Sequence, residues 1–256
     1  MPPVLVERRG AVAWCTLDRP PLNLLDPELI EAVREAFTGL TADPGVRAAV
    51  LTGRGRAFTA GMNVHVLHDL DVGRAKALIS SLHAMIASVH HAPFPVIARV
   101  NGFCLGAGFE LALACDVRVA ASTARFGLPE VRVGLPSVIE AALLPALVGP
   151  GRAAEMLLTG ESVDAGQAEA WGLVNRSVPI EQLDTAVDTI VGRVLACGPA
   201  AVRLQKELMV RWRYTDLATA IGYGVNAFAT AYATREPQEG ARAFLEKRAP
   251  RFEDRT

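Results

Sequence analysis

The chain has 256 residues, of which 51% are hydrophobic and 21% are charged, with 22 glycines and 16 prolines. This composition is typical of a compact globular protein and excludes a disordered or fibrous one. Lys and Arg together number 26 against 27 Asp and Glu, so the sequence lacks the overall positive charge that draws proteins to nucleic-acid backbones. Nucleic acid is therefore not expected as a partner.

Signals for a membrane or a metal are also weak. The opening MPPVLVERRG lacks the apolar core of a signal peptide, and no stretch reaches the roughly 18 uninterrupted apolar residues of a membrane span. The cysteines, Cys15, Cys104, Cys115 and Cys197, form no Cys-x-x-Cys pair, and no His-Glu-x-x-His motif occurs. We expect a cytoplasmic protein with free thiols, no metal ion and no membrane partner.

The predicted elements begin with a β-hairpin. Residues 4–6 and 12–17 alternate between apolar and polar side chains around a turn at Gly10. Asp26 and Pro27 then provide an N-cap and an N1 proline for an amphipathic helix. The apolar face of that helix contains Leu29, Ile30, Val33, Phe37 and Leu40.

Strand, glycine-rich turn and helix then repeat along the chain. The predicted strands are residues 48–52, 95–100 and 117–121, with helical apolar faces over 78–89 and 109–114. From Gly149 the pattern is mainly helical, apart from a strand near residues 173–178. These patterns predict an α/β core over residues 1–197 and a helical module over residues 198–256.

Two glycine-containing turns are candidate anion sites. The small residues before Met62 permit a sharp turn that leaves a backbone N–H facing a cleft. Residues 101–110 contain a second turn, in which Ala107 opens an apparent helix whose free N–H groups and dipole favour a developing negative charge. Taken alone, the first segment is more typical of an ordinary turn.

Gly102, Gly106 and Gly108 also have the spacing of some dinucleotide-binding turns, which raises the alternative of a nicotinamide-dependent oxidoreductase. Three observations count against this alternative. The turn does not follow the first strand, no Tyr-x-x-x-Lys motif is present, and no acidic residue lies about 20 positions further on after a second strand.

Two glutamates each follow a glycine-containing turn. They are Glu110 and Glu130, which lie twenty positions apart. A carboxyl group in an apolar stretch has its neutral form favoured by desolvation, so it can donate a proton near neutral pH. Two such groups can divide the acid and base roles. Each glutamate alone is more typical of a solvated or capping residue.

Together these segments resemble the enoyl-CoA hydratase/isomerase family, also called the crotonase family, over essentially the entire chain. The matching stretches are residues 51–55, 57–61, 101–110, 115–116, 126–130 and 239–248. The resemblance implies a crotonase-like spiral of ββα units with a C-terminal helical oligomerisation module, assembled as a homotrimer or a dimer of trimers. It implies no cofactor beyond the coenzyme A of the substrate.

The resemblance also implies roles for single residues. The backbone N–H groups of Met62 and Ala107 would form an oxyanion hole for the thioester carbonyl of an acyl-CoA. Glu110 and Glu130 would hold a water that adds across a trans-2-enoyl-CoA to give a 3-hydroxyacyl-CoA. Further candidate substrate contacts are Ala60, Gly61 and Gly106, together with Phe228 and Lys247, which could equally belong to an amphipathic helix with a solvated basic edge.

The chain departs from the family pattern in two places. Asn63 replaces an aspartate after the first turn, and residues 134–140 replace a glycine-rich run. Ser137 and Glu140 would therefore fill space beside the acyl chain, and Glu140 would add a third carboxylate near the site. A helical position that points to solvent is nevertheless the favoured expectation for Glu140.

Several functions stay open at this point. Isomerases of the family commonly use one carboxylate, so a pair favours a hydratase without excluding an enoyl-CoA isomerase or another acyl-CoA lyase or hydrolase. A non-catalytic acyl-CoA-binding protein is the alternative from a different class. Which glutamate acts as acid and which as base, and the length of the acyl chain, also stay open.

Overall fold

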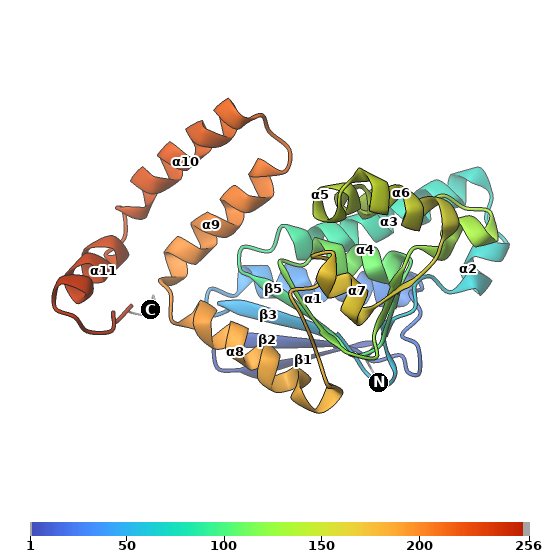
Figure 1. Ribbon diagram of the computed structural model, residues 1–256, viewed down its shortest axis with the longest axis horizontal. Coiled ribbons are helices and arrows are strands. Elements are labelled where there is room, and N and C mark those ends of the chain that lie inside the picture. The colour runs from blue at the N-terminus through green and yellow to red at the C-terminus, as the bar shows by residue number, and fades with distance from the viewer. Residues whose placement is uncertain (1, 253–256) are drawn as a thin grey trace.

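The computed structural model describes residues 2–252 and contains two sheets (Figure 1). The strands are β1 Val4–Arg9, β2 Val12–Leu17, β3 Ala48–Gly53, β4 Ala57–Thr59, β5 Val96–Val100, β6 Phe103–Leu105, β7 Val117–Ala121, β8 Arg125–Gly127, β9 Val163–Asp164 and β10 Arg176–Val178. The larger sheet has the order β1-β2-β3-β5-β7-β10, and the smaller has the order β4-β6-β8-β9.

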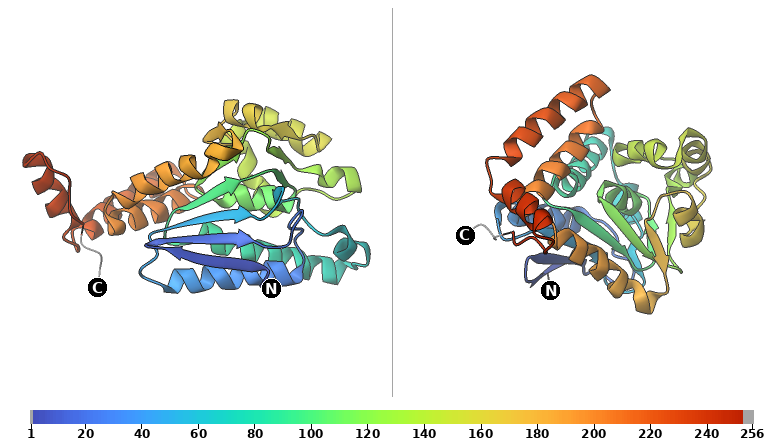
Figure 2. Two further views of the ribbon diagram at one scale, coloured as in Figure 1. Left: turned by 90° about the horizontal axis from the view of Figure 1, so that it is seen from below. Right: turned by 60° about the vertical axis from the view of Figure 1, so that its left-hand side comes forward.

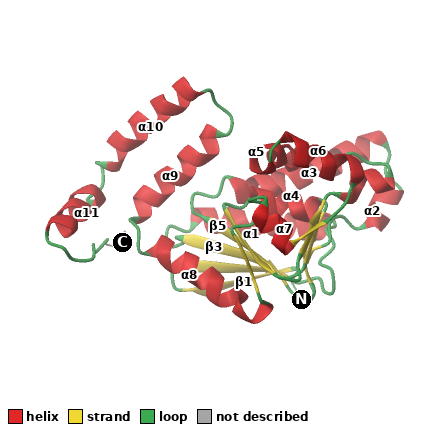
Figure 3. Ribbon diagram, in the orientation of Figure 1, coloured by secondary structure: helices red, strands yellow, loops and turns green. Residues whose placement is uncertain are grey.

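Helices surround the two sheets (Figure 3). The α-helices are α1 Pro27–Ala42, α2 Val64–His68, α3 Val72–His90, α4 Ala107–Ala114, α5 Leu144–Val148, α6 Pro150–Thr159, α7 Ala165–Ala170, α8 Leu183–Leu195, α9 Pro199–Trp212, α10 Leu217–Ala231 and α11 Glu236–Leu245. The 3₁₀ helices are η1 Pro129–Val133, η2 Ile139–Leu143 and η3 Ile180–Gln182.

The connectivity is a spiral of strand–strand–helix units. β3, β5 and β7 are neighbours in the larger sheet, while β4, β6 and β8, which directly follow them in the chain, are neighbours in the smaller one. Within each set the paired strands run parallel, and a helix follows each smaller-sheet strand. The predicted α/β fold with ββα units is confirmed.

Local signals explain the first elements. β1 and β2 pair antiparallel, with Arg9 opposite Val12 and a turn in which Gly10 adopts a φ of 62°. The Asp26 side chain accepts a hydrogen bond from the Leu29 N–H at 2.8 Å and so caps α1. The five apolar residues predicted for one face of this helix are all buried.

The larger sheet is covered on both faces (Figure 2). One face packs with α1, α3 and α4 in the main hydrophobic core, which contains Phe37, Met85 and Phe109. The opposite face packs against α8 in a second cluster that includes Trp14 and Val187. Because both faces are buried, β3 is buried at every position.

Helices α9, α10 and α11 form an arm that projects away from the sheets (Figures 1 and 2). Lys206 of α9 is tied to the core by an ion pair with Asp116 at 2.6 Å, and both side chains are largely buried. By contrast, α10 has no buried residue. Its exposed large apolar residues are Leu217, Ile221, Val225 and Phe228, and exposed Tyr232 follows as the C-cap residue.

Within residues 2–252, no single helix is both long and apolar enough to cross a membrane. One bent pair, Ile180–Leu195 with Pro199–Trp212, reaches the necessary length and composition only when the two helices are taken together, and they meet at an angle of 107°.

Candidate active site

The candidate site lies where three short parallel strands of the smaller sheet end. β4 pairs with β6, and β6 pairs with β8, all in the same direction. Parallel neighbouring strands end at the same edge, and ligands of such sheets bind beyond their carboxyl ends. The segments that follow the three strands begin at Ala60, Gly106 and Leu128, so the fold brings both predicted turns and Glu130 to one place.

Gly61 and Gly106 touch each other across this edge. Their φ values are 92° and 54°, in the region that side chains rarely adopt. A Cβ atom added to Gly61 would lie 2.9 Å from the Leu105 carbonyl oxygen, and one added to Gly106 would lie 3.8 Å from the Gly61 Cα. Glycine is therefore required for the two turns to approach.

The residues after these glycines present free backbone donors. The Leu25 N–H donates to the Gly61 carbonyl and the Asn63 N–H donates to the Leu25 carbonyl, so the Met62 N–H faces away from Leu25. Ala107 is the first residue of α4, where helical N–H groups lack intrahelical acceptors. Neither the Met62 nor the Ala107 N–H has an acceptor among residues 2–252. Two such donors together can bind a developing oxyanion.

Glu110 lies in the first turn of α4 and is only 3% exposed. Burial, followed by the negative charges of Glu130 and Glu140, raises its pKa to about 9, although the nearby backbone N–H groups of Ala141 and Val138 oppose the shift. The carboxyl group is therefore neutral at neutral pH. It can deliver a proton there.

Glu130 lies in η1, directly after β8, and both of its oxygens are constrained. The Ser137 hydroxyl donates to Oε2 at 2.7 Å. Oε1 lies against the second turn, since a Cβ atom on Gly106 would be 2.5 Å from it. The carboxylate thus sits beside the turn that carries Ala107, with one oxygen held and the other directed at the candidate oxyanion site.

This contact also removes support for a dinucleotide-binding turn. In such a turn a phosphate approaches the glycine backbone at the start of the helix. Here the Glu130 carboxylate occupies that approach to Gly106, and its negative charge would repel a phosphate.

Glu140 does not point to solvent, so the favoured expectation for it was wrong. Its side chain is 12% exposed, and its Oε1 lies 2.7 Å from Nδ1 of His83 on α3. The physical reason is tertiary: η2 packs against both α3 and α4, so a residue of this short helix faces protein on two sides. Burial raises the pKa of Glu140, and the hydrogen bond from His83 opposes that rise.

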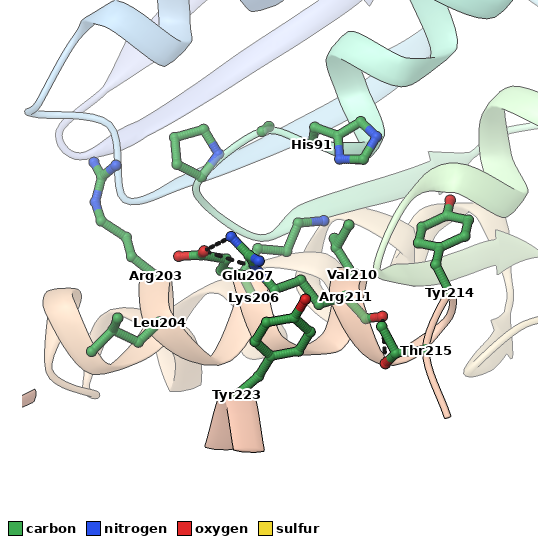
Figure 4. Close-up of a pocket in the computed structure, with 12 residues that line it drawn as sticks. His91, Arg203, Leu204, Lys206, Glu207, Val210, Arg211, Tyr214, Thr215 and Tyr223 are labelled. Atoms are coloured by element: carbon green, nitrogen blue, oxygen red, sulfur yellow. Dashed lines mark hydrogen bonds and ion pairs between the residues drawn. The ribbon is translucent and has the colours of Figure 1, made fainter. Parts of the chain in front are cut away.

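The structure does not bring the two predicted arm residues to this site within one chain. Phe228 lies on α10 and is 69% exposed, and Lys247 follows α11 (Figure 1). A cavity of about 580 Å³ lies at the base of the arm, between α9 and residues 91–93. Two of its cations are paired with carboxylates, Arg211 with Glu207 (Figure 4) and Lys206 with Asp116, and Arg203 donates hydrogen bonds to the backbone carbonyls of Pro44 and Val46.

Some functional contacts were missed by the sequence analysis. Ser137 was expected beside the acyl chain, and its bond to Glu130 has no signal in the sequence, nor has the pairing of His83 with Glu140. Asn63, the residue that departs from the family aspartate, accepts a hydrogen bond from the His65 N–H at 3.1 Å and caps α2. Among residues 2–252 no group of three or more His, Cys, Asp or Glu side chains could hold a metal ion.

Comparison with known proteins identifies the family of the chain. A family model described as enoyl-CoA hydratase/isomerase matches residues 7–255. A crotonyl-CoA hydratase of Syntrophomonas wolfei is 37% identical over 252 residues, 97% of each chain. A short-chain-enoyl-CoA hydratase of Clostridium acetobutylicum is 33% identical, over 96% of this chain and 95% of the relative. The crystal structure of an enoyl-CoA hydratase from Mycobacterium smegmatis superimposes with a TM-score of 0.95 at 35% identity, covering 98% of this chain and 99% of the other. The chain belongs to the enoyl-CoA hydratase/isomerase family.

Proposed function

We propose that this protein is an enoyl-CoA hydratase, which adds water across a trans-2-enoyl-CoA to give a 3-hydroxyacyl-CoA. The observation that carries the proposal is the pair of carboxyl groups, Glu110 and Glu130, beside two backbone N–H donors that have no acceptor within the described residues. Full-length relatives named as crotonyl-CoA and short-chain-enoyl-CoA hydratases support the same reaction.

In the proposed mechanism, the thioester carbonyl oxygen binds between the N–H groups of Met62 and Ala107. When water attacks the β-carbon, negative charge develops on that oxygen as an enolate forms. Donors that are already in place stabilise this charge without reorganisation, and loss of one typically costs about 2.7–4 kcal/mol of transition-state stabilisation. Both donors are backbone groups, so the Met62 side chain does not affect the donation. Ala60, Gly61 and Gly106 serve by shaping the two turns.

The two carboxyl groups divide the proton transfers. Glu130, whose Oε2 is held by Ser137, accepts a proton from the attacking water through its free oxygen. Glu110, which is neutral because its pKa is raised to about 9, donates its proton to the α-carbon. The hydroxide equivalent and the proton together make up one water. Return of a proton from Glu130 to Glu110 then restores the starting state.

Retention of both carboxyl groups favours a hydratase over an isomerase, which moves one proton and adds no water. Parallel assays with 2-enoyl-CoA and 3-enoyl-CoA substrates distinguish the two reactions. Hydration of crotonyl-CoA is expected, with strong losses in Glu110→Gln and Glu130→Gln. The exposed Glu155→Gln serves as a matched control. Wild-type hydration by the Glu130→Gln protein would contradict the two-carboxylate mechanism. Tight binding of enoyl-CoA without turnover would indicate a non-catalytic binding protein.

We also infer a homotrimer or a dimer of trimers, assembled through the arm over residues 198–256. The exposed apolar stripe on α10 supports this, because monomeric proteins rarely leave such a large patch uncovered. In that assembly Phe228 and Lys247 would contact the coenzyme A of a neighbouring subunit. No cofactor beyond coenzyme A is proposed. A cytoplasmic location fits the three buried free thiols, Cys15, Cys104 and Cys115.

A further inference from the structure

The mechanism above uses Glu110 and Glu130 but leaves Glu140 without a role. Its two oxygens have different surroundings. Oε1 is bonded to His83, whose side chain is 57% exposed and therefore marks the solvent side. Oε2 is buried and has no hydrogen-bond partner among residues 2–252. A buried carboxylate oxygen without a donor is unfavourable, and such atoms are rare in folded proteins.

The backbone beside Glu140 is strained as well. Ile139 has a φ of 43°, a conformation that β-branched residues avoid. This conformation belongs to the residue that immediately precedes Glu140 at the start of η2. A strained backbone and an unpaired buried acceptor at neighbouring residues both weaken the fold. Features of this kind persist mainly where they serve a site.

Glu140 lies close to the proposed active site. η2, which contains Glu140, packs against α4, the helix that carries Glu110, and the charge of Glu140 is close enough to contribute to the raised pKa of Glu110. η2 also contacts α3, and Ile79 of α3 and Ile139 and Leu143 of η2 are partly buried apolar residues that pack against the main core. Glu140 therefore places one buried, unpaired hydrogen-bond acceptor near the carboxyl group of Glu110, which is proposed to protonate the α-carbon.

We propose that Glu140, held by His83, is a specificity-determining residue whose Oε2 accepts a hydrogen bond from a hydroxyl group on the acyl part of the substrate. This inference rests on the proposed hydratase function and names its substrate class, which is 2-enoyl-CoA thioesters that carry a hydroxyl close to the double bond. A plain alkyl chain would leave Oε2 buried and unpaired. Sites built around such an acceptor discriminate strongly against ligands that lack the donor.

The test uses substrate pairs of nearly equal size, in which a hydroxyl replaces a terminal methyl group. Suitable pairs are 4-hydroxy-2-butenoyl-CoA with 2-pentenoyl-CoA and 5-hydroxy-2-pentenoyl-CoA with 2-hexenoyl-CoA. The full-length wild-type protein is expected to show a kcat/KM at least about tenfold higher for the hydroxylated member of one pair. Because the readout is a ratio within one protein, a folding defect that lowers both activities does not change it.

Variants assign the preference to Glu140. Glu140→Met, which is similar in size but apolar, is expected to reverse the ratio in favour of the alkyl substrate. His83→Ala, which leaves the carboxylate unsupported, is expected to reduce it, and the exposed Glu155→Met is expected to keep the wild-type ratio. Hydration of both members at similar rates by the wild-type protein, or an unchanged ratio in Glu140→Met, would overturn this inference and leave the hydratase function standing. Failure to hydrate any of the four substrates would overturn both.

Discussion

Ser137 offers a sharp test of the proposed division of roles between the two glutamates. Its hydroxyl donates to Glu130 Oε2 at 2.7 Å, within the range of strong hydrogen bonds to a charged acceptor. Ser137→Ala removes this bond and allows the carboxylate to rotate away from Gly106. Hydrogen bonds to charged groups contribute about 1.5–3 kcal/mol, and about 1.4 kcal/mol corresponds to a factor of ten in rate.

The expected loss in kcat is therefore about tenfold to 100-fold. The lower value is favoured because Ser137 is only partly buried and water can replace part of the bond. The KM for crotonyl-CoA should change little, since Ser137 holds the base and does not bind the thioester. Ser137→Thr keeps the hydroxyl and should restore most of kcat. Steady-state assays of the wild type, Ser137→Ala and Ser137→Thr test these expectations for kcat and KM. A kcat for Ser137→Ala within about twofold of wild type, or a change in KM alone, would refute this role for Ser137.

Three other predictions follow from contacts described above. Glu110 can act as the acid only while it is protonated, so kcat/KM should fall as the pH rises through about 9, the pKa of this residue. A kcat/KM that stays constant across that range would contradict the acid role of Glu110. Gly106→Ala places a Cβ atom 2.5 Å from Glu130 Oε1 and should therefore lower kcat. The control is Gly10→Ala, because Gly10 also has a positive φ but its added Cβ meets nothing within 4 Å. Equal effects of the two substitutions on kcat would show that Glu130 needs no fixed position. Lys206→Met leaves Asp116 buried without its partner and should lower the free energy of unfolding by about 3 kcal/mol in urea denaturation, whereas the exposed Lys76→Met should leave it nearly unchanged.

The elements that the sequence predicted well carry strong local signals. α1 was predicted because the cap of Asp26 and the spacing of its apolar residues agree with each other. β4, β6 and β8 were not predicted, because each has three residues and is too short to show an alternating pattern. These strands form only because neighbouring turns of the spiral supply their hydrogen-bond partners, and those partners are far away in sequence.

The same limit, that contacts between distant parts of the chain leave no local sequence pattern, applies to the candidate site. Glu110 and Glu130 could be named because each follows a glycine-containing turn, and the family resemblance paired them. The burial of Glu140 could not be predicted, because it depends on His83, which lies 57 positions earlier on α3. A local pattern cannot indicate which distant helix will pack against a short segment. The same holds for Ser137, which meets Glu130 only because the Leu135 N–H donates to the Glu130 carbonyl and folds the intervening chain back.

The site residues come from separate units of the spiral, so substitutions in one unit can change part of the site and leave the rest unchanged. The two proposed oxyanion donors and Glu110 follow β4 and β6, whereas Ser137 and Glu140 belong to the segment after β8. Under the proposed roles, exchanging residues 134–140 for the equivalent stretch of another family member is expected to alter acyl selection and the support of Glu130 without moving the two turns proposed to bind the thioester. New substrates can arise through replacement of one loop, while the part of the enzyme that activates every thioester is inherited intact.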